Sequence, residues 1–450
     1  MQTKKVLIIG EVFVDHHLDI KDGDVPVSRL GGIFHAARAC AALNVDYALA
    51  YYAPRYLEKS VNDFGKGELN AKDLCLLGVI DNSPNVMLIT NSDESGDQLY
   101  DNILCRQAVF FNKESVSDVI NRFSPTDIVI FPGRYGNSDI LSEINCFKIN
   151  LHIDMNYDSK DIYDITDFHA KTIILSTSTI IFKHFFEKNS YSDLVDFFKN
   201  KNVSTLLIKE NRGGSWIYDF CKDRSYEAPA IFMNRIVHSV GVGDVYDISY
   251  LFGMNDSETI MNRMKFASWV SVLYAKTLDY NSFQNNIKPI LSRSYFLQLD
   301  GIRISWFERK KYPIYIAAPD FNYIDTEIID ILEQSLRYHN FLPVRPIKEN
   351  GQVSETTTAA EEDVIFLKDI KLLDDCKIMI AVLLYNDQGT LTEIGKYHEA
   401  GKPIVLFDPY KKLNNMFLKH IVTCYCNTNS QVIDKVFEII RRMEKDGKQI

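Results

Sequence analysis

Short apolar segments typical of β-strands alternate with helical patterns along the whole chain. In the first two-thirds, the strand candidates are residues 6–10, 47–52, 127–131, 148–153, 172–175 and 205–208. The pattern starts again at Pro313, with a strand, a helix at 326–338 and a further strand at 341–344. Alternating strands and helices build α/β folds, whose ligands bind beyond the carboxyl ends of parallel strands. We therefore expect an α/β chain in which two different folds meet near residue 305.

Length and charge narrow the class of protein further. At 450 residues the chain exceeds a single typical hydrophobic core, so two domains are expected. Its 46% hydrophobic and 24% charged residues are typical of a globular protein. A net charge of -10 and a pI of about 5.6 argue against nucleic acid as a partner. The short basic group Arg309-Lys310-Lys311 is expected to be a solvated linker.

Patterns of membrane insertion and of cysteine-based metal sites are absent from the sequence. The apolar run at residues 6–9 is too short for a signal peptide or a membrane span. The eight cysteines lack CxxC or zinc-like spacing, and the close pair Cys424 and Cys426 would share one face of a strand. The sequence therefore predicts reduced thiols, no metal site, no membrane partner and a cytoplasmic location.

The stretch from Asp387 to Gly395 follows the apolar run 378–384 and is typical of a strand, a turn and a helix that opens with a carboxylate. A helix N-terminus keeps a carboxylate ionised, and an ionised glutamate such as Glu393 can attack a sugar carbon. A structural alternative is open. Residues 390–393 also fit the capping box S/T-x-x-E, in which Glu393 would only close the helix.

Several motifs in order resemble the nucleoside 2-deoxyribosyltransferase family over about residues 312–430. They are Ile-Tyr-Ile-Ala-Ala-Pro at 314–319, Asp369 within 367–370, Asp-x-Gly-Thr-x-x-Glu-Ile-Gly at 387–395, and the next strand at 401–406. The resemblance implies a smaller, flavodoxin-like parallel-sheet domain at residues 312–450. It also implies cleavage of the N-glycosidic bond of a (deoxy)nucleoside, without a cofactor, and transfer of the sugar to a base or water.

The resemblance assigns a role to five residues. Glu393 would be the nucleophile that traps an oxocarbenium-like state, and Asp369 would protonate the departing base or hold its ring nitrogens. Tyr315 would orient the nucleophile, and Asp387 would bind a sugar hydroxyl. Asp387 stands where relatives that cleave monophosphates carry a phosphate-binding serine, which favours a free nucleoside. Asn414 would be lent to a neighbouring subunit, which implies a homo-oligomer. Taken singly, these residues also permit structural roles. Asp369 could be a solvated helix residue or an N-cap, and Tyr315 could be a core residue. Asp387 could be a turn residue, and Asn414 could be purely structural.

Residues 238–246, His-Ser-Val-Gly-Val-Gly-Asp-Val-Tyr, resemble the Gly-x-Gly-Asp signature of the ribokinase-like (PfkB) sugar and nucleoside kinases. Supporting matches are Asp15 after Gly10-Glu11, Gly31-Gly32 before a helix at 36–43, Asp-Met-Asn at 154–156, and the loop at 209–215. The resemblance implies a ribokinase-like α/β sandwich at residues 1–300.

In such a kinase, glycines let backbone N–H groups approach a phosphate at a helix N-terminus, and an aspartate deprotonates the acceptor hydroxyl. The resemblance makes Asp244 the general base and implies ATP and Mg²⁺ as cofactors if the domain is active. The remaining assignments are Asp15, Gly31 and Gly32 for substrate binding, and Gly241, Gly243, Lys209 and Gly214 for the nucleotide or its phosphates.

The sequence also departs from the kinase pattern. Residues 175–179 read Leu-Ser-Thr-Ser-Thr where an Asn-x-x-Glu segment is usual, and Asp247 begins a segment where small residues are usual. His238 replaces a common acidic residue, and His35 or Ala36 replaces an expected asparagine. An active kinase and a retained fold with an altered site are therefore both open.

The two resemblances together predict a nucleoside-processing enzyme. Its C-terminal domain would cleave nucleosides, and its N-terminal domain would phosphorylate or bind a sugar or nucleoside. The alternative is a nucleotide or dinucleotide glycohydrolase whose kinase-like domain is a non-catalytic sensor or scaffold. The expected partners are small-molecule nucleoside or sugar substrates, with no nucleic acid and no membrane.

Overall fold

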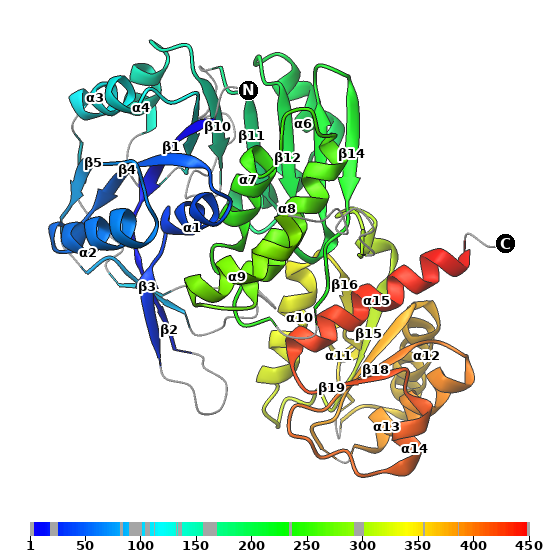
Figure 1. Cartoon of the computed structure of the whole chain (residues 1–450). Helices are drawn as coiled ribbons and strands as arrows, with labels where there is room; N and C mark the ends of the chain where they lie inside the picture. Colours follow the sequence, from blue (N-terminus) through cyan, green and yellow to red (C-terminus); the bar gives the residue numbers. More distant parts are fainter. Residues whose placement is uncertain are drawn as a thin grey trace. The chain divides into compact units, whose positions relative to one another are not determined.

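The computed structural model divides the chain into two compact units, coloured blue to green and yellow to red in Figure 1. The change of unit falls between Arg303 and Ile304. The structure describes residues 4–18, 26–81, 84–89, 101–103, 109–111, 113–131, 133, 137–155, 169–233, 236–291, 301–353, 356–385 and 387–447.

The N-terminal unit is built on a ten-stranded sheet. In spatial order its strands are β14 (Arg224–Ala228), β13 (Ser215–Asp219), β12 (Thr205–Lys209), β11 (Thr172–Ser176), β10 (Asn150–Asp154), β9 (Asp127–Ile130), β1 (Lys5–Glu11), β4 (Asp46–Ala53), β5 (Asp73–Ile80) and β8 (Val109–Phe111). The strands from β12 to β5 are parallel, and antiparallel strands flank them. The six strand candidates of this region are confirmed, and they lie side by side at the centre of the sheet.

Helices cover both faces of this sheet. From β1 the chain continues to β4 and β5 on one side of the sheet, and from β9 it continues to β10, β11 and β12 on the other side. Right-handed crossovers in these two directions place the connecting helices on opposite faces of the sheet. One face packs on a core formed with α1 (Phe34–Ala42), α2 (Glu58–Asn62), α7 (Val242–Phe252), α8 (Ile260–Ala275) and α9 (Tyr280–Leu291). The other helices are α3 (Lys113–Phe123), α4 (Asn137–Ile144), α5 (Ile180–Phe186) and α6 (Tyr191–Lys199).

A second, four-stranded sheet belongs to the same unit. Its order is β3 (Val27–Leu30), β2 (Val14–His17), β6 (Val86–Ile89) and β7 (Asp101–Ile103). Only β2 and β6 pair in parallel. Strand β2 follows β1 almost directly, so Asp15 lies beyond the carboxyl end of a central strand, where α/β folds place their ligands.

The C-terminal unit contains a five-stranded sheet in which all strands are parallel. Its order is β16 (Leu342–Val344), β15 (Pro313–Ala317), β17 (Ile378–Val382), β18 (Ile404–Phe407) and β19 (Cys424–Cys426). Numbered along the chain this is the order 2-1-3-4-5, so the predicted flavodoxin-like sheet is confirmed. The order reverses between β15 and β17, and ligands of such sheets bind at this switch point.

The helices of this unit are α10 (Glu327–Tyr338), α11 (Pro346–Asn350), α12 (Ala359–Asp375), α13 (Gln388–Glu399), α14 (Met416–Ile421) and α15 (Asn429–Gly447). The core on the side of α12, α13 and α14 contains Tyr315, Leu373, Ile394, Tyr397 and Leu418. In the described parts of the two units, no helix has both the length and the apolar character needed to cross a membrane.

The basic group at residues 309–311 was expected to be a solvated linker, and this expectation was wrong for Arg309. Arg309 is fully buried. Its guanidinium donates to the carbonyl oxygens of Ile304 at 3.2 Å and His339 at 3.1 Å, and it lies over the rings of Trp306 and Phe437. Backbone carbonyl oxygens and aromatic rings thus stabilise the buried charge of Arg309. Lys310 and Lys311, which follow it, are exposed.

Candidate active site

Tyr315 and Glu393 form the centre of the site in the C-terminal unit. They come from β15 and α13, 78 residues apart in sequence, and the Tyr315 hydroxyl donates to Glu393 Oε1 at 2.6 Å. Tyr315 is fully buried, and the side chains of Ile394 and Tyr397 pack in the same core. The hydrogen bond from this buried tyrosine therefore fixes the orientation of the Glu393 carboxylate.

The protonation of Glu393 differs from the sequence-based expectation. Its pKa is raised to about 7: burial raises it most, the hydrogen bond from Tyr315 lowers it, and the carboxylates of Asp369 and Asp387 add to the rise. The expectation that the helix N-terminus keeps Glu393 ionised was wrong, because α13 begins at Gln388 and Glu393 lies beyond its first turn. At neutral pH this carboxylate is close to the midpoint of its titration.

Asp387 is the N-cap of α13. Its Oδ2 accepts hydrogen bonds from the Thr390 backbone N–H at 2.6 Å and from the Thr390 hydroxyl at 2.7 Å. The capping-box alternative for Glu393 is therefore wrong, since Thr390 is not the N-cap and Glu393 does not close the helix. Within the described part of the chain, Asp387 Oδ1 makes no hydrogen bond, so a ligand hydroxyl could still donate to it.

Asp369 lies on α12 and is half-buried. Burial raises its pKa, while a hydrogen bond from Asn350 Nδ2 to its Oδ1, 2.7 Å long, lowers it. The N-cap alternative for Asp369 was wrong, since Thr358 caps this helix together with Glu361. Asn350, at the end of α11, was missed by the sequence analysis because it belongs to no motif and no periodic pattern.

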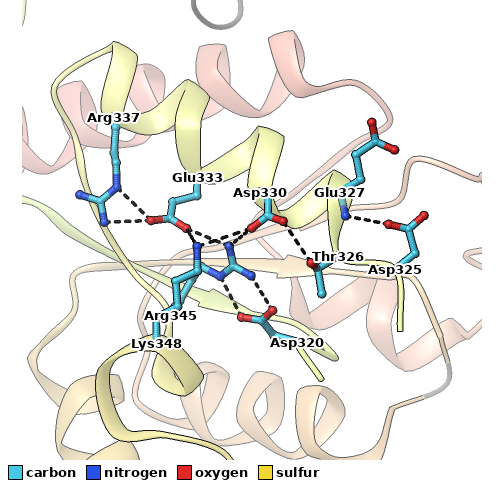
Figure 2. A network of polar contacts seen from close by, with 9 residues as sticks. All are labelled: Asp320, Asp325, Thr326, Glu327, Asp330, Glu333, Arg337, Arg345 and Lys348. Carbon is cyan, nitrogen blue, oxygen red and sulfur yellow. Dashed lines mark hydrogen bonds and ion pairs between the residues drawn. The ribbon is translucent and has the colours of Figure 1, made fainter. Parts of the chain in front are cut away.

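Arg345 holds the neighbouring loops in place (Figure 2). It follows β16, its side chain is 3% exposed, and its guanidinium forms a two-pronged contact with Asp320, which follows β15. It also donates to Asp330 and, at 2.8 Å, to Glu333 on α10. Lys348 on α11 donates to Glu333 as well, at 2.7 Å. These contacts tie α10, α11 and the loop after β15 together, and thereby place Asn350 against Asp369.

Asn414 does not join the other four residues. It lies on the exposed segment after β18, and its side chain makes no hydrogen bond within the parts of the chain that the structure describes. An exposed, uncommitted side chain is what sharing with another subunit would require, and assembly stays a prediction.

In the N-terminal unit, the residues expected to bind a sugar contact one another. Asp15 Oδ2 lies 3.1 Å from His35 Nε2 and 3.7 Å from Arg29 Nε. His35 Nδ1 is 2.7 Å from the Tyr274 hydroxyl. A Cβ on Gly31 would stand 1.9 Å from Asp15 Oδ1, so only glycine allows the aspartate to lie there. Gly32 has a φ of +60° and closes the same turn.

The Gly-x-Gly-Asp motif forms the start of α7, with Gly241 as N-cap at a φ of +73° and Asp244 in the first turn. Burial and the nearby Asp154 raise the pKa of Asp244 to about 8. A Cβ on Gly243 would stand 3.2 Å from Lys209 Nζ. Gly214, at a φ of +97°, packs against the carbonyl oxygen of Ala228 and shapes the loop before β13. Asn156 lies outside the described residues.

One group of carboxylates in this unit could hold a metal ion. An oxygen of each of Asp154, Asp244 and Asp247 lies within 4.8 Å of the other two. Lys209 Nζ already lies 3.0 Å from Asp154 and 2.7 Å from Asp247. The residues present therefore do not fit a divalent cation beside this ammonium.

The fold and the site define a two-unit α/β chain whose C-terminal sheet carries a tyrosine–glutamate pair at its switch point. Residues 314–432, which lie within the C-terminal unit, match the family model described as nucleoside 2-deoxyribosyltransferase, so this part of the chain is similar to that family. No curated protein sequence matches the chain.

Solved structures similar to about 65% of this chain include ribokinase and phosphofructokinase structures. Arabidopsis thaliana ribokinase, complexed with ribose and ATP, is 11% identical with a TM-score of 0.46. Escherichia coli phosphofructokinase-2, in complex with potassium, is 12% identical with a TM-score of 0.47. A microbiome-derived acarbose kinase is 14% identical with a TM-score of 0.45. Each similarity covers 65% of this chain and 100% of the other.

Proposed function

We propose that the C-terminal unit cleaves the N-glycosidic bond of a free (deoxy)nucleoside through Glu393 and transfers the sugar to a base or to water. The observation that carries the proposal is the hydrogen bond from Tyr315 to Glu393 Oε1, with the carboxylates of Asp369 and Asp387 close enough to raise the pKa of Glu393. One oriented carboxylate with a second carboxyl nearby is the arrangement that retaining glycosidases use.

The first step forms a glycosyl-enzyme. Glu393 attacks C1′ with the oxygen that Tyr315 leaves free, and the C1′–N bond breaks with its electron pair moving to the base nitrogen. Asp369 supplies a proton to the departing base, and its raised pKa favours the protonated form that this requires. Asp387 Oδ1 accepts a hydrogen bond from a sugar hydroxyl. Its negative charge would repel a phosphate, which favours a nucleoside over a nucleotide.

The second step releases the sugar. A new base, or water, attacks C1′ from the face that the first base left, and the C1′–O bond to Glu393 breaks with its electrons returning to the carboxylate. Asp369 accepts the proton of the attacking group and returns to its starting state. The same two carboxyl groups therefore serve both transfer and hydrolysis.

Product analysis tests this function. The full chain is incubated with a panel of nucleosides, deoxynucleosides and their monophosphates, with and without acceptor bases, and the products are separated by mass spectrometry. Free base should appear from nucleosides, and a new nucleoside should appear when an acceptor base is present. Release from monophosphates alone would instead support the nucleotide glycohydrolase, and no release from any donor would refute the proposal.

The rate of glycosyl-enzyme formation should depend on pH through Glu393. With a nitrophenyl deoxyriboside, whose leaving group needs no proton, we expect the rate to rise about tenfold per pH unit below 7 and to level off above it. Stopped-flow release of nitrophenol from pH 4.5 to 9 checks this. A rate already constant at pH 5 would show that Glu393 is ionised there, and that its pKa is not raised.

Protein stability offers a second measure of the same titration. Between its ordinary value of 4.5 and about 7, the folded chain holds a proton on Glu393 that the unfolded chain has lost, so stability falls as the pH rises through this window. Across this window the free energy of unfolding should fall by about 3 kcal/mol. Glu393→Gln, which keeps the acceptor for Tyr315 and removes the charge, should therefore be more stable than the wild type at pH 8 and equal to it at pH 4.5.

Asn350 should act on catalysis through Asp369. Asn350→Ala removes the donor that orients the acid, and we expect the release of a natural base to fall about tenfold, the effect of one hydrogen bond of about 1.4 kcal/mol. The nitrophenyl donor, which needs no acid, should lose far less. Equal losses on both donors would show that Asn350 only supports the structure. Asn322→Ala, in the adjacent loop, is the control.

For the N-terminal unit we propose the non-catalytic alternative, a domain that binds a sugar or nucleoside, or stabilises the assembly, without phosphoryl transfer. The supporting observation is that Asp15 and Lys209, both expected to contact ligands, are already paired with His35 and with Asp154 and Asp247. ATP consumption across a panel of sugars and nucleosides tests this. Turnover that is lost in Asp244→Asn would restore the kinase alternative.

A further inference from the structure

The side chain of Lys209 lies inside the acidic cluster of the N-terminal unit, formed by Asp154, Asp244 and Asp247. Lys209 is the last residue of β12 and is 7% exposed. Its ammonium donates to Asp154 Oδ2 at 3.0 Å and to Asp247 Oδ2 at 2.7 Å. It therefore contacts two of the three carboxyl groups that, with one oxygen each mutually within 4.8 Å, could hold a divalent cation.

Charge accounts for the position of the ammonium. The Lys209 ammonium forms ion pairs with Asp154 and Asp247, whose side chains are fully buried, while its own side chain is 8% exposed. Its positive charge offsets part of the negative charge that three neighbouring carboxyl groups bring together, as a bound cation would.

The cluster nevertheless retains capacity for a ligand. Asp247 is fully buried, and its Oδ1 has no hydrogen-bond donor among the described residues. An uncompensated oxygen at this depth is costly, and a metal ion satisfies such oxygens where one ammonium satisfies only some of them.

The glycines of the motif allow this packing. At Gly243 the missing side chain leaves room for the Lys209 ammonium, and at Gly241 a Cβ would stand 2.0 Å from His35 Cγ. In the kinases that the motif resembles, such glycines would let a phosphate approach the backbone. In this chain, Lys209 and His35 fill the space beside them.

We infer that Lys209 is a tethered cation that takes the place of a divalent metal ion in the acidic cluster, and that the cluster becomes a site for Mg²⁺ or Mn²⁺ when the ammonium is removed. The inference rests on the geometry of the N-terminal unit and is independent of nucleoside cleavage by the C-terminal unit. It explains the non-catalytic alternative for this unit, since the Lys209 ammonium of the wild-type chain already contacts the carboxylates that would bind a nucleotide's metal ion.

Mn²⁺ binding to the full chain, followed by electron paramagnetic resonance and by calorimetric titration, tests the inference. Lys209→Ala should gain one Mn²⁺ site at least tenfold tighter than any site of the wild type, with proton release on binding and a melting temperature that Mn²⁺ raises and EDTA lowers. The gain should disappear in the double variant Lys209→Ala, Asp247→Ala. Lys222→Ala, which removes an exposed partner of Asp219, is the matched control and should gain nothing.

Two results would overturn the inference. One is a Mn²⁺ site in the wild type that Asp247→Asn removes, because the metal and Lys209 would then share the cluster; this measurement does not depend on the folding of any lysine variant. The other is a Lys209→Ala chain that gains no Mn²⁺ site, whether it is folded or stays unfolded at every Mn²⁺ concentration. A variant that folds only when Mn²⁺ is present would support it.

Discussion

Glu393→Gln should lower base release from a nucleoside roughly 10⁴-fold, a loss in the range seen when a catalytic residue that forms a covalent intermediate is removed. The glutamine keeps the volume and the oxygen that accepts from Tyr315, so the loss reports the missing nucleophile and not a disturbed core. Initial rates with saturating nucleoside provide the measurement. Mass spectrometry of the quenched wild type should reveal the sugar adduct on a peptide containing residue 393.

The matched control is Glu399→Gln at the exposed end of the same helix. It removes the same charge from α13 without touching Tyr315, and it should retain wild-type rates. Base release that persists in Glu393→Gln, or a sugar adduct on another residue, would refute the assignment of the nucleophile.

The second large effect should follow from removing the buried guanidinium of Arg345. Arg345→Met leaves Asp320 and Glu333 without their main buried partner, and we expect the C-terminal unit to lose about 3–5 kcal/mol of unfolding free energy. Scanning calorimetry of the full chain should show a lower transition temperature for this unit. Arg345→Lys should recover only part of the loss, because an ammonium lacks the two-pronged geometry of the contact with Asp320.

Arg337→Met separates burial from charge. Arg337 contacts the same Glu333 at 2.9 Å, but its side chain is 54% exposed, compared with 3% for Arg345. Water screens the exposed pair, so the expected loss is at most about 1 kcal/mol. Similar losses in Arg345→Met and Arg337→Met would contradict the importance of burial in this network.

The central strands of both units could be predicted because they are covered on both faces. Such strands appear in the sequence as nearly continuous apolar runs, for example Val6–Ile9 and Ile378–Val382. Two strands of the small sheet could not be found in this way. Val14–His17 contains three polar residues and one apolar residue, and Val27–Leu30 contains two of each. Val14–His17 also pairs with Val86–Ile89, which is far away in the chain.

The candidate nucleophile and its tyrosine could be recognised from motif spacing, but their electrostatics could not. The position of Glu393 in the helix depends on where the helix begins, and the capping aspartate moves that start to Gln388. Burial then decides the pKa of Glu393, and burial is a property of the packed unit. Asn350 and Arg345 were missed for a related reason, since each acts through a partner that only the fold brings close.

The Arg345 network also determines how the site behaves in acid. Burial alone would raise the pKa of Glu333, but Lys348 and Arg345 lower it to about 2, and contacts with Arg345 and Thr326 lower that of Asp330 against its own burial. Between pH 7 and pH 5, Glu393 therefore takes up a proton, while the Arg345 network keeps its charges. Inactivation by mild acid should accordingly be fully and rapidly reversible, because only Glu393 gains a proton and the Arg345 network stays intact.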